Sequence, residues 1–421
     1  MSAADAPASV RELLKHRNYC IYLSGDFVSL IGNWTQRIAI GWLTWQLTES
    51  TTWLGIIAFA DLFPAVILSP IGGVIADRGD PRRISLQTQS IAMLHASTLF
   101  LTSALGILDI WLLVALVTLR GCIAAINQPA RFALIPSLIP RELLSTALAS
   151  NAVLFNLARF IGPAIAGLVI VQAGVSGAFA VNAASYFALL AALWSIDTSP
   201  VKRAPQAKNS MGAQVSAGYR YVAQHRGLGP LLLLFAIGSI LVRPLTELLP
   251  GFADGVFNEG AAGLAWFTSA MGVGAMLGGL VMVRRNALDQ VFQATIISLA
   301  VMCVSVLLFT LAPSFWAAVG LVTVAACALS VNGIGTQTLA QSAVAGDMRG
   351  RVMSLYGVLF RGGPAIGAVI IGVVADHAGL AWPTAAGALL CLGLWLWAMR
   401  RRQGIKDALT GTGTRVAAPK I

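Results

Sequence analysis

The sequence predicts an all-α integral membrane protein with twelve transmembrane helices in two six-helix bundles. Of its 421 residues, 57% are hydrophobic and only 11% are charged, whereas about a quarter of the residues in an average soluble domain are charged. Apolar runs of about eighteen or more residues, which are long enough to cross a bilayer, recur along the whole chain. Because so few charges cannot cover a water-facing surface of this size, lipid is the expected solvent.

Polar residues separate the apolar runs into two sets of six predicted spans. The first set covers residues 19–46, 53–76, 84–107, 110–128, 147–171 and 174–196. The second set covers residues 228–250, 262–283, 290–311, 314–336, 352–374 and 380–399. The predicted regions are therefore a first bundle at 1–196, a cytoplasmic linker at 197–227, a second bundle at 228–400 and a basic cytoplasmic tail at 401–421.

The linker contains a pattern that predicts a short amphipathic helix. Val215, Tyr219 and Val222 would share one helical face, as in helices that lie on a membrane surface. A solvated linker is the alternative interpretation.

Lysine and arginine are distributed unequally between the two sides of the predicted membrane. Five of the 28 basic residues lie inside spans, and the other 23 fall in every second loop and near both termini. Because basic loops stay on the cytoplasmic side, we expect a multi-pass protein of the cell inner membrane with both termini in the cytoplasm. The same threading explains the net charge of +11 without a nucleic-acid partner.

The sequence predicts neither an enzyme nor a metal or cofactor site. Its four histidines and five cysteines are scattered, without a CxxC pair or a spacing that suits zinc. It contains no GxxxxGK[ST] nucleotide-binding loop, so an ion gradient is the expected source of energy for any transport. Residues 1–17 lack the apolar run of a removable signal peptide.

A short repeat relates the two halves of the chain. The string GPAI occurs at Gly162–Ile165 in the fifth span and again at Gly363–Ile366 in the eleventh. Each copy follows a basic cytoplasmic loop and lies at the same place in its set of six. Two sets of six helices related by parallel repeats are typical of membrane transporters.

Four segments resemble the major facilitator superfamily, and within it the bacterial exporter branch that includes the enterobactin exporter. The segments are GGVIADRGDPRR at 72–83, NAVLFNLARFIGPAIAG at 151–167, LVRPLTELLPGFAD at 241–254 and RGRVMSLYGVLF at 349–360. The resemblance implies a monomeric secondary transporter that exports a small amphipathic molecule, such as a drug, a siderophore or a related metabolite, by proton antiport with alternating access. The alternative is a lipid or lysolipid flippase-like transporter of the same fold.

The loop after the second span matches the cytoplasmic gate motif of the superfamily. The matching residues are Gly73, Asp77, Arg78, Arg82 and Arg83, and Asp80 and Pro81 replace the second glycine of the motif. In physical terms, Gly73 would let two helices approach, and Asp77 could pair with a cation or with a helix N-terminus. The resemblance implies a gate latch, and a basic loop that only sets topology is the alternative.

The fifth span resembles the antiporter signature of the same family. Gly162, Pro163 and Gly167 match it, whereas alanine replaces glycine at three other positions, Ala149, Ala158 and Ala166. Small residues allow close packing, and a proline removes an internal hydrogen bond and permits a bend. In the family this pattern accompanies export, and ordinary tight packing is the alternative.

Eight ionisable side chains fall inside predicted spans, where a charge costs about 2.5–3.5 kcal/mol. They are Asp26, Arg37, Asp61, Arg120, Arg159, Arg243, Glu247 and Arg361. Asp26 and Asp61 have no cation three or four residues away, so both are candidate proton carriers. Arg120 matches the intramembrane arginine that the superfamily uses in proton transfer.

The remaining polar residues at membrane depth are candidates for substrate binding or for structural pairing. The substrate-binding candidates are Asn33, Gln36, Arg37, Arg159 and Arg361. Arg243 and Glu247 could pair along one helix, although Glu247 is also a candidate for proton coupling. For Arg120, Arg159 and Arg361, structural pairing with Asp26 or Asp61 is the alternative.

Overall fold

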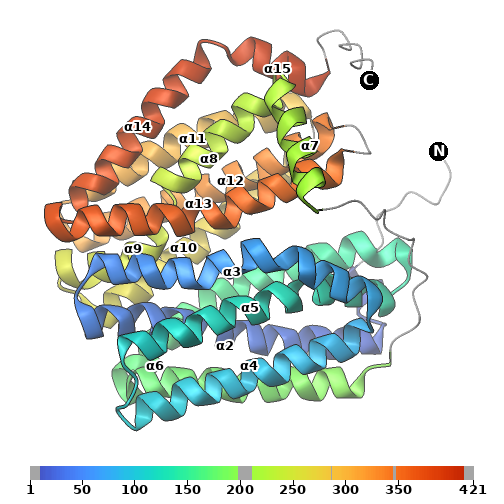
Figure 1. The fold of residues 1–421 in the computed structure, drawn as a ribbon, viewed down its shortest axis with the longest axis vertical. Coiled ribbons are helices and arrows are strands. Elements are labelled where there is room, and N and C mark those ends of the chain that lie inside the picture. Colours follow the sequence, from blue (N-terminus) through green and yellow to red (C-terminus); the bar gives the residue numbers. More distant parts are fainter. Residues whose placement is uncertain (1–9, 198–210, 286, 345–347, 412–421) are drawn as a thin grey trace. The chain divides into compact units, whose positions relative to one another are not determined.

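The computed structural model describes residues 10–197, 211–285, 287–344 and 348–411, and these ranges are helical (Figure 1). The helices of the first half are α1 Val10–Leu13, α2 Arg17–Thr48, α3 Thr51–Arg78, α4 Pro81–Ala104, α5 Ile110–Leu134, η1 Ile135–Ser137, η2 Arg141–Leu143 and α6 Leu144–Ser195. Those that follow are α7 Met211–Gln224, α8 Leu228–Leu241, α9 Leu245–Gly251, the π-helical turn η3 Phe252–Val256, α10 Gly260–Val283, α11 Leu288–Thr310, α12 Phe315–Ala343, α13 Arg349–Ala378, α14 Ala381–Met399 and α15 Arg402–Thr410. The described ranges contain no β-strand.

Nine helices in the described ranges are long and apolar enough to cross a membrane. They are α3, α5 with η1, α6 with η2, α8 to η3 together, and each of α10 to α14. The long helices α2 and α4 are outside this set, and α6 is included once although a non-helical residue, Gly174, divides it. The all-helical membrane fold is confirmed, whereas the count of twelve crossings stays a prediction.

The chain divides into two compact units. Unit 1 contains Met1–Gln206 and Leu249–Gly272, and unit 2 contains Ala207–Leu248 and Val273–Ile421. The predicted bundle and linker boundaries stay predictions. Residues 198–210 and 412–421, which belong to the predicted linker and tail, lie outside the described residues.

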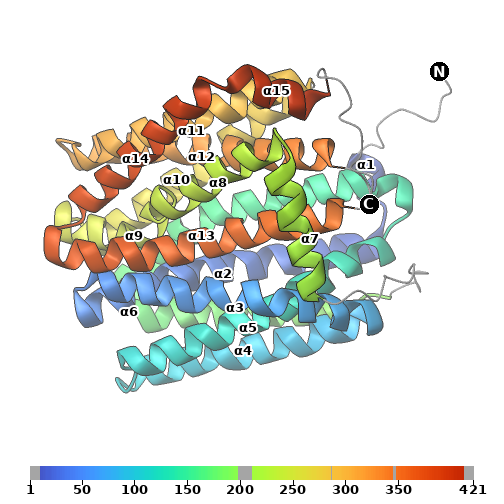
Figure 2. The same cartoon turned by 45° about the horizontal axis from the view of Figure 1, so that its top comes forward.

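The helices α2 to α6 lie side by side in unit 1 (Figures 1 and 2). Gln36 of α2 accepts a hydrogen bond from Asn182 of α6 at 2.7 Å, and Tyr19 of α2 donates to the carbonyl of Ala147 of α6 at 3.0 Å. The first contact therefore joins α2 to the part of α6 after Gly174, and the second joins it to the part before. Gly174 has φ +69°, a conformation that glycine adopts at little cost, and it divides α6 into two helices.

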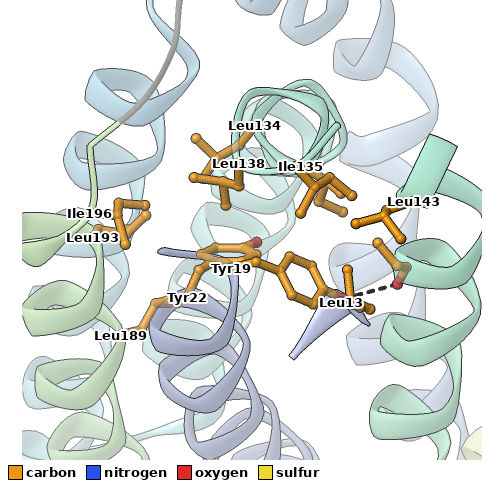
Figure 3. Close-up of a cluster of buried hydrophobic side chains, with 12 residues drawn as sticks. Leu13, Tyr19, Tyr22, Leu134, Ile135, Leu138, Leu143, Leu189, Leu193 and Ile196 are labelled. Atoms are coloured by element: carbon orange, nitrogen blue, oxygen red, sulfur yellow. Dashed lines mark hydrogen bonds between the residues drawn. The ribbon is translucent and has the colours of Figure 1, made fainter. Parts of the chain in front are cut away.

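A cluster of apolar side chains closes one end of unit 1. Leu13, Tyr19 and Tyr22 pack there with residues from η1, η2 and both ends of α6 (Figure 3). This end contains the start of α2 and the end of α5, so it lies at the face that the basic loops predict to be cytoplasmic. Burial of several large side chains, each worth about 1.5–3 kcal/mol, fixes the helix ends that carry the polar residues described below.

In unit 2, a histidine precedes the start of helix α8 and a proline follows its end. His225 accepts hydrogen bonds from the backbone N–H groups of Gly227 and Leu228, both at 3.1 Å. Burial lowers the pKa of His225, which favours the neutral ring that can accept such bonds. The span predicted at 228–250 lies within the candidate span Leu228–Val256 but is interrupted: α8 ends at Leu241 and α9 starts at Leu245, because Pro244 has no N–H to continue the ladder.

The GPAI repeat makes the same kind of contact in both units. A Cβ atom on Gly162 of α6 would clash with Trp34 of α2, and one on Gly363 of α13 would lie 2.6 Å from the Cβ of Ser239 of α8. In each half, the glycine therefore lets the fifth helix touch the first. This shared geometry agrees with the parallel repeat that the sequence indicates.

Helix α7 covers Met211–Gln224, where the sequence predicts a short amphipathic helix. Of the three residues predicted to share its apolar face, Val222 is buried and Tyr219 is exposed, while the side chain of Val215 lies outside the described ones. A Cβ on Gly218 would approach Arg351 of α13 at 3.2 Å. The position of α7 at the membrane surface stays a prediction.

The contact at Gly162 generates a prediction on stability. Gly162→Ala should lower the free energy of unfolding by about 1–3 kcal/mol, because a methyl group added to a packed interface forces the helices apart. Thermal unfolding of the purified protein in detergent measures the effect. Gly320→Ala on α12 is the matched control, since a Cβ there meets nothing within 4 Å; equal loss in both variants would contradict the prediction.

Candidate functional site

Three helices of unit 1 meet at the carboxylate of Asp61. Asp61 lies on α3, and its oxygens are 2.5 Å from Nη2 of Arg120 on α5 and 3.3 Å from Nη1 of Arg37 on α2. The three side chains are 11%, 20% and 30% exposed, respectively. Two of the candidate cations thus pair with a candidate carboxylate, which is the structural alternative that the sequence left open for Arg120.

Small residues bring α3 and α5 together at this ion pair. A Cβ on Gly121 would lie 2.6 Å from the carbonyl oxygen of Asp61 and 3.2 Å from Cγ of Pro64. The two backbones therefore touch where Asp61 and Arg120 meet. His95 of α4 donates from Nε2 to the carbonyl of Leu116 of α5 at 2.9 Å, the hydrogen-bonded packing that we expect of a buried histidine.

A second ion pair joins α2 to the end of α5. Nη2 of Arg131 lies 2.5 Å from Oδ2 of Asp26, whose residue is only 3% exposed. The sequence predicts Arg131 in a loop after a span that ends at residue 128, and this is wrong, because α5 continues through Pro129 to Leu134. Arg131 follows Arg120 by eleven residues, about three helical turns, so the spacing places both on one face of α5.

An aromatic ring lies beside two arginines of unit 1. The guanidinium carbons of Arg37 and Arg159 are 5.8 Å and 5.5 Å from the centre of the Trp34 ring, within the range of cation–π attraction. Phe155 meets the same ring edge to face at 5.8 Å. Arg37 therefore links this aromatic group to the Asp61 ion pairs.

The two uncharged polar candidates of α2 bind to side chains of α6. Gln36 is 1% exposed and accepts from Asn182. Asn33 is half-buried and accepts a hydrogen bond from the hydroxyl of Tyr186 at 3.0 Å. These bonds hold α2 against α6, and a role of Asn33 or Gln36 in substrate binding stays a prediction.

The candidates of unit 2 lie near an aromatic cluster. Arg243 is 4.2 Å from the centre of the Phe360 ring, and Phe235 stacks on Tyr356 at 4.9 Å. Arg243 lies in the break between α8 and α9, so it does not share one continuous helix with Glu247 as predicted. Glu247 accepts a hydrogen bond from Thr246, and Arg361 is a half-buried residue of α13.

The gate motif forms the end of α3 and the start of α4. Asp80 caps α4 by accepting from the N–H of Arg82 at 2.9 Å, and Pro81 occupies the first turn, a favoured arrangement at a helix start. The two residues that depart from the family pattern therefore begin a helix. Asp77 and Arg78 are exposed at the end of α3.

Close helix approach in this motif occurs at Gly72. A Cβ on Gly72 would clash with the carbonyl of Ala125 of α5, whereas one on Gly73 would meet nothing within 4 Å. The prediction that Gly73 lets two helices approach is therefore wrong by one position, because a shift of one residue turns a side chain by about 100° around a helix.

Arg82 connects the gate motif to the far end of α6. Its Nε and Nη2 donate to the carbonyls of Leu193 and Trp194, both at 2.8 Å. These carbonyls belong to the last turn of α6, which lacks partners within the helix. Arg83 points elsewhere: it is 84% exposed and lies 3.7 Å from Asp80.

The antiporter-like motif packs against α2 and α10 within unit 1. Gly162 meets Trp34, and its carbonyl accepts a hydrogen bond from Thr35 at 3.1 Å. A Cβ on Gly167 would clash with Ala265. Pro163 is buried in the same helix. The motif thus sets the position of Trp34, and through it the position of the arginines beside that ring.

Histidine, cysteine and acidic side chains are scattered in the part of the chain that the structure describes. Within them, no group of three or more His, Cys, Asp or Glu side chains could hold a metal ion. The five cysteines are free thiols.

Comparison with known protein families identifies the group to which the chain belongs. A family model described as transmembrane secretion effector matches residues 13–412. The chain belongs to this family of the major facilitator superfamily. The predicted resemblance is confirmed, and the protein is a multi-pass membrane transporter and not an enzyme.

Several curated transporters are similar in sequence to this facilitator. It is 24% identical to macrolide efflux protein A of Streptococcus pyogenes over 392 residues. This alignment covers 90% of this chain and 95% of the efflux protein. It is 26% identical over 329 residues to the enterobactin exporter of Escherichia coli, with 78% and 76% covered. The staphyloferrin A transporter of Staphylococcus aureus is 31% identical over 167 residues, so this match spans 39% of the chain and only 42% of that transporter's length.

Solved transporter structures share the fold of this facilitator. A POT family transporter in complex with 5-aminolevulinic acid has a TM-score of 0.71 at 12% identity, with 92% of this chain and 96% of that chain covered. A nucleoside transporter has a TM-score of 0.70 at 11% identity, with 91% and 99% covered. At such low identity the likeness shows the fold alone.

The contacts of Arg82 and Arg83 generate a second prediction. Arg82→Gln should lower the free energy of unfolding by about 1–2 kcal/mol, because a charged donor to the α6 carbonyls is lost. Arg83→Gln, the neighbouring control, should cost about 0.5 kcal/mol or less, as expected for an exposed ion pair. Both values come from unfolding in detergent, and a larger loss for Arg83→Gln would refute this assignment of the two arginines.

Proposed function

We propose that this facilitator is a secondary active exporter of a small amphipathic molecule, such as a drug, a siderophore or a related metabolite, driven by protons through alternating access. The observation that carries the proposal is that unit 1 holds two carboxylates inside predicted spans, the buried Asp26 and the half-buried Asp61, each paired with arginine from another helix. Relatives named for macrolide efflux and enterobactin export support outward transport. The protein would act as a monomer among the lipids of the cell inner membrane, with both termini cytoplasmic.

A proton that binds a buried carboxylate changes which helices are held together. Ionised Asp26 and ionised Asp61 each hold helices together through charge, and a protonated carboxyl would not attract a guanidinium in this way. The two protonation states therefore differ in their contacts, and a ligand shifts a conformational equilibrium only through such a difference. Asp26, Asp61, Arg120 and Glu247 are the proposed proton-coupling residues.

The surroundings of Trp34 suit a molecule with both apolar and polar parts. The rings of Trp34 and Phe155 offer aromatic surface, and Arg37 and Arg159 place guanidinium groups beside it. Most transport substrates bind in sites that are largely apolar with a few placed polar groups. Arg37 and Arg159, with Arg361 of unit 2, are therefore the proposed charged substrate contacts.

The two sequence motifs supply the moving parts of the proposed cycle. Arg82 attaches the loop after α3 to the end of α6, so the loop motif with Asp77 would act as a cytoplasmic latch. Pro163 removes one hydrogen bond from α6 next to Gly162, which allows α6 to bend. Bending of helices beside a fixed binding site is the kind of movement that alternating access requires.

Transport in proteoliposomes tests the proposal. A panel of amphipathic compounds, including lysolipids, is first screened for export in cells that lack or contain the protein, with and without an uncoupler. Asp26→Asn and Asp61→Asn should then abolish movement of the exported compound driven by a pH gradient and leave its binding measurable, because proton coupling is lost while the side chains around Trp34 remain.

The control for this experiment is Asp109→Asn. Asp109 caps α5 in a loop outside the spans and accepts from the N–H of Leu112 at 2.8 Å, a role that asparagine also fills. Its transport rate should equal that of the unmodified protein. Full pH-driven transport in both intramembrane variants would remove proton coupling through Asp26 and Asp61, and export restricted to lysolipids would favour the flippase-like alternative.

A further inference from the structure

The carboxylates of Asp26 and Asp61 in unit 1 differ in the number of guanidinium groups that pair with them. Asp61 has two guanidinium partners, Arg120 at 2.5 Å and Arg37 at 3.3 Å. Among the residues that the structure describes, Asp26 has one such partner, Arg131 at 2.5 Å. The first group therefore carries a net charge of +1 and the second is neutral when both carboxylates are ionised.

The addition of a proton has different consequences at the two places. At Asp61 it would leave two guanidinium groups close together around a neutral carboxyl, so the local charge would rise from +1 to +2. At Asp26 it would raise the local charge from zero to +1. Because like charges repel strongly where water is scarce, the proton is easier to accept at Asp26.

The surroundings of Asp26 also favour exchange of its charge. The residue is 3% exposed, and the neighbouring Gly25 packs against Ala188 and Ala192 of α6, which offer only apolar side chains. The other titratable groups that face Asp26 and Arg131 are the hydroxyls of Tyr19 and Tyr22 on α2 and of Tyr186 on α6. A buried carboxylate with one counter-ion and no further charged partner in this set depends on that counter-ion for its ionised form.

The ion pairs of Asp61 and Asp26 also differ in their positions along the helices. Asp61 and Arg120 meet where the backbones of α3 and α5 touch at Gly121, so their ion pair lies inside a tight helix contact. Arg131 lies in the last turn of α5, and its Nε donates to the hydroxyl of Tyr22 at 3.5 Å. The partner of Asp26 therefore comes from a helix end, whereas the partners of Asp61 come from the middle of their helices.

We propose that Asp26 is the carboxylate that takes up and releases the transported proton, that Arg131 is the positioning residue that holds it ionised, and that Asp61 keeps its charge as a tie between helices. This inference deepens the proposed function and rests on it. Proton uptake at Asp26 neutralises the carboxylate and releases Arg131, so the end of α5 separates from α2. Proton release restores the pair.

Infrared titration of the purified full-length protein tests this assignment without any substrate. A protonated carboxyl group absorbs at a different frequency from a carboxylate. Because the chain has 17 acidic residues, the spectrum of each variant is subtracted from that of the unmodified protein, which isolates the band of the replaced residue. A protonated-carboxyl band should be lost in Asp26→Asn and kept in Asp61→Asn. A band that is lost in Asp61→Asn, or retained in both variants, would overturn the proposal.

Arg131 variants test the positioning role in a protein that keeps Asp26. Removal of an adjacent arginine from a carboxylate changes its protonation equilibrium by about tenfold or more. Arg131→Gln should therefore raise the ratio of protonated to ionised Asp26 at a fixed pH by about tenfold, and Arg131→Lys should restore most of the original ratio. An unchanged titration in Arg131→Gln would refute the role of Arg131.

The results also separate this inference from the proposed function. If the band follows Asp26 but a pH gradient drives no export in proteoliposomes, the proton site stands and the proposed coupling fails. If export is proton-driven but the band follows Asp61, the assignment to Asp26 fails and the proposed function stands.

Discussion

The cost of placing charge in hydrocarbon is the constraint on which the structure of unit 1 depends. An isolated charge at that depth costs about 2.5–3.5 kcal/mol on the lenient insertion scale, so ionised groups there need partners. Asp61 finds them on α2 and α5, and Asp26 finds one on α5. Because each arginine lies on another helix than the carboxylate that it pairs with, the need for charge neutralisation specifies which helices are neighbours.

Small residues make these ion pairs geometrically attainable. Gly121 allows α3 and α5 to touch at Asp61, and Gly162 allows α6 to touch α2 at Trp34. The fifth-span motif therefore has a structural consequence beyond packing, since it fixes the ring beside which Arg37 and Arg159 lie. Export, proton coupling and substrate contact, as proposed, all involve side chains that these close contacts position.

The sequence predicts the helices well because their signal is local. Apolar runs, basic loops and the GPAI repeat are read along the chain, and α3, α10 and α13 lie where those patterns indicate. The capped start of α4 is equally local, since Asp80 and Pro81 are a common combination at a helix start. The sequence alone therefore predicts that Asp80 and Pro81, which replace the second glycine of the family motif, begin a helix.

The partners of the buried charges are harder to predict because they depend on which faces of different helices meet. The apolar pattern ends the fourth span at residue 128 and therefore does not indicate Arg131, although the sequence shows its spacing of eleven residues from Arg120. The same difficulty applies to the gate motif. The sequence predicts the close helix contact at Gly73, but the structure has it at Gly72, because neighbouring residues point to different faces of a helix. The break before α9 has a local cause, Pro244, which is visible in the sequence. The continuous apolar run over 228–250 nevertheless does not indicate this break.

The account depends most directly on the ion pair of Asp61 and Arg120, and a comparison of single and double variants tests it. Asp61→Asn leaves two arginines without this carboxylate, so it should be the least stable variant in detergent unfolding. Addition of Arg120→Gln should then recover part of the lost free energy, because removal of one member of a buried pair costs more than removal of both. If Arg120→Gln lowers the stability of Asp61→Asn further, by as much as it lowers that of the unmodified protein, the two side chains are not coupled and the account is contradicted.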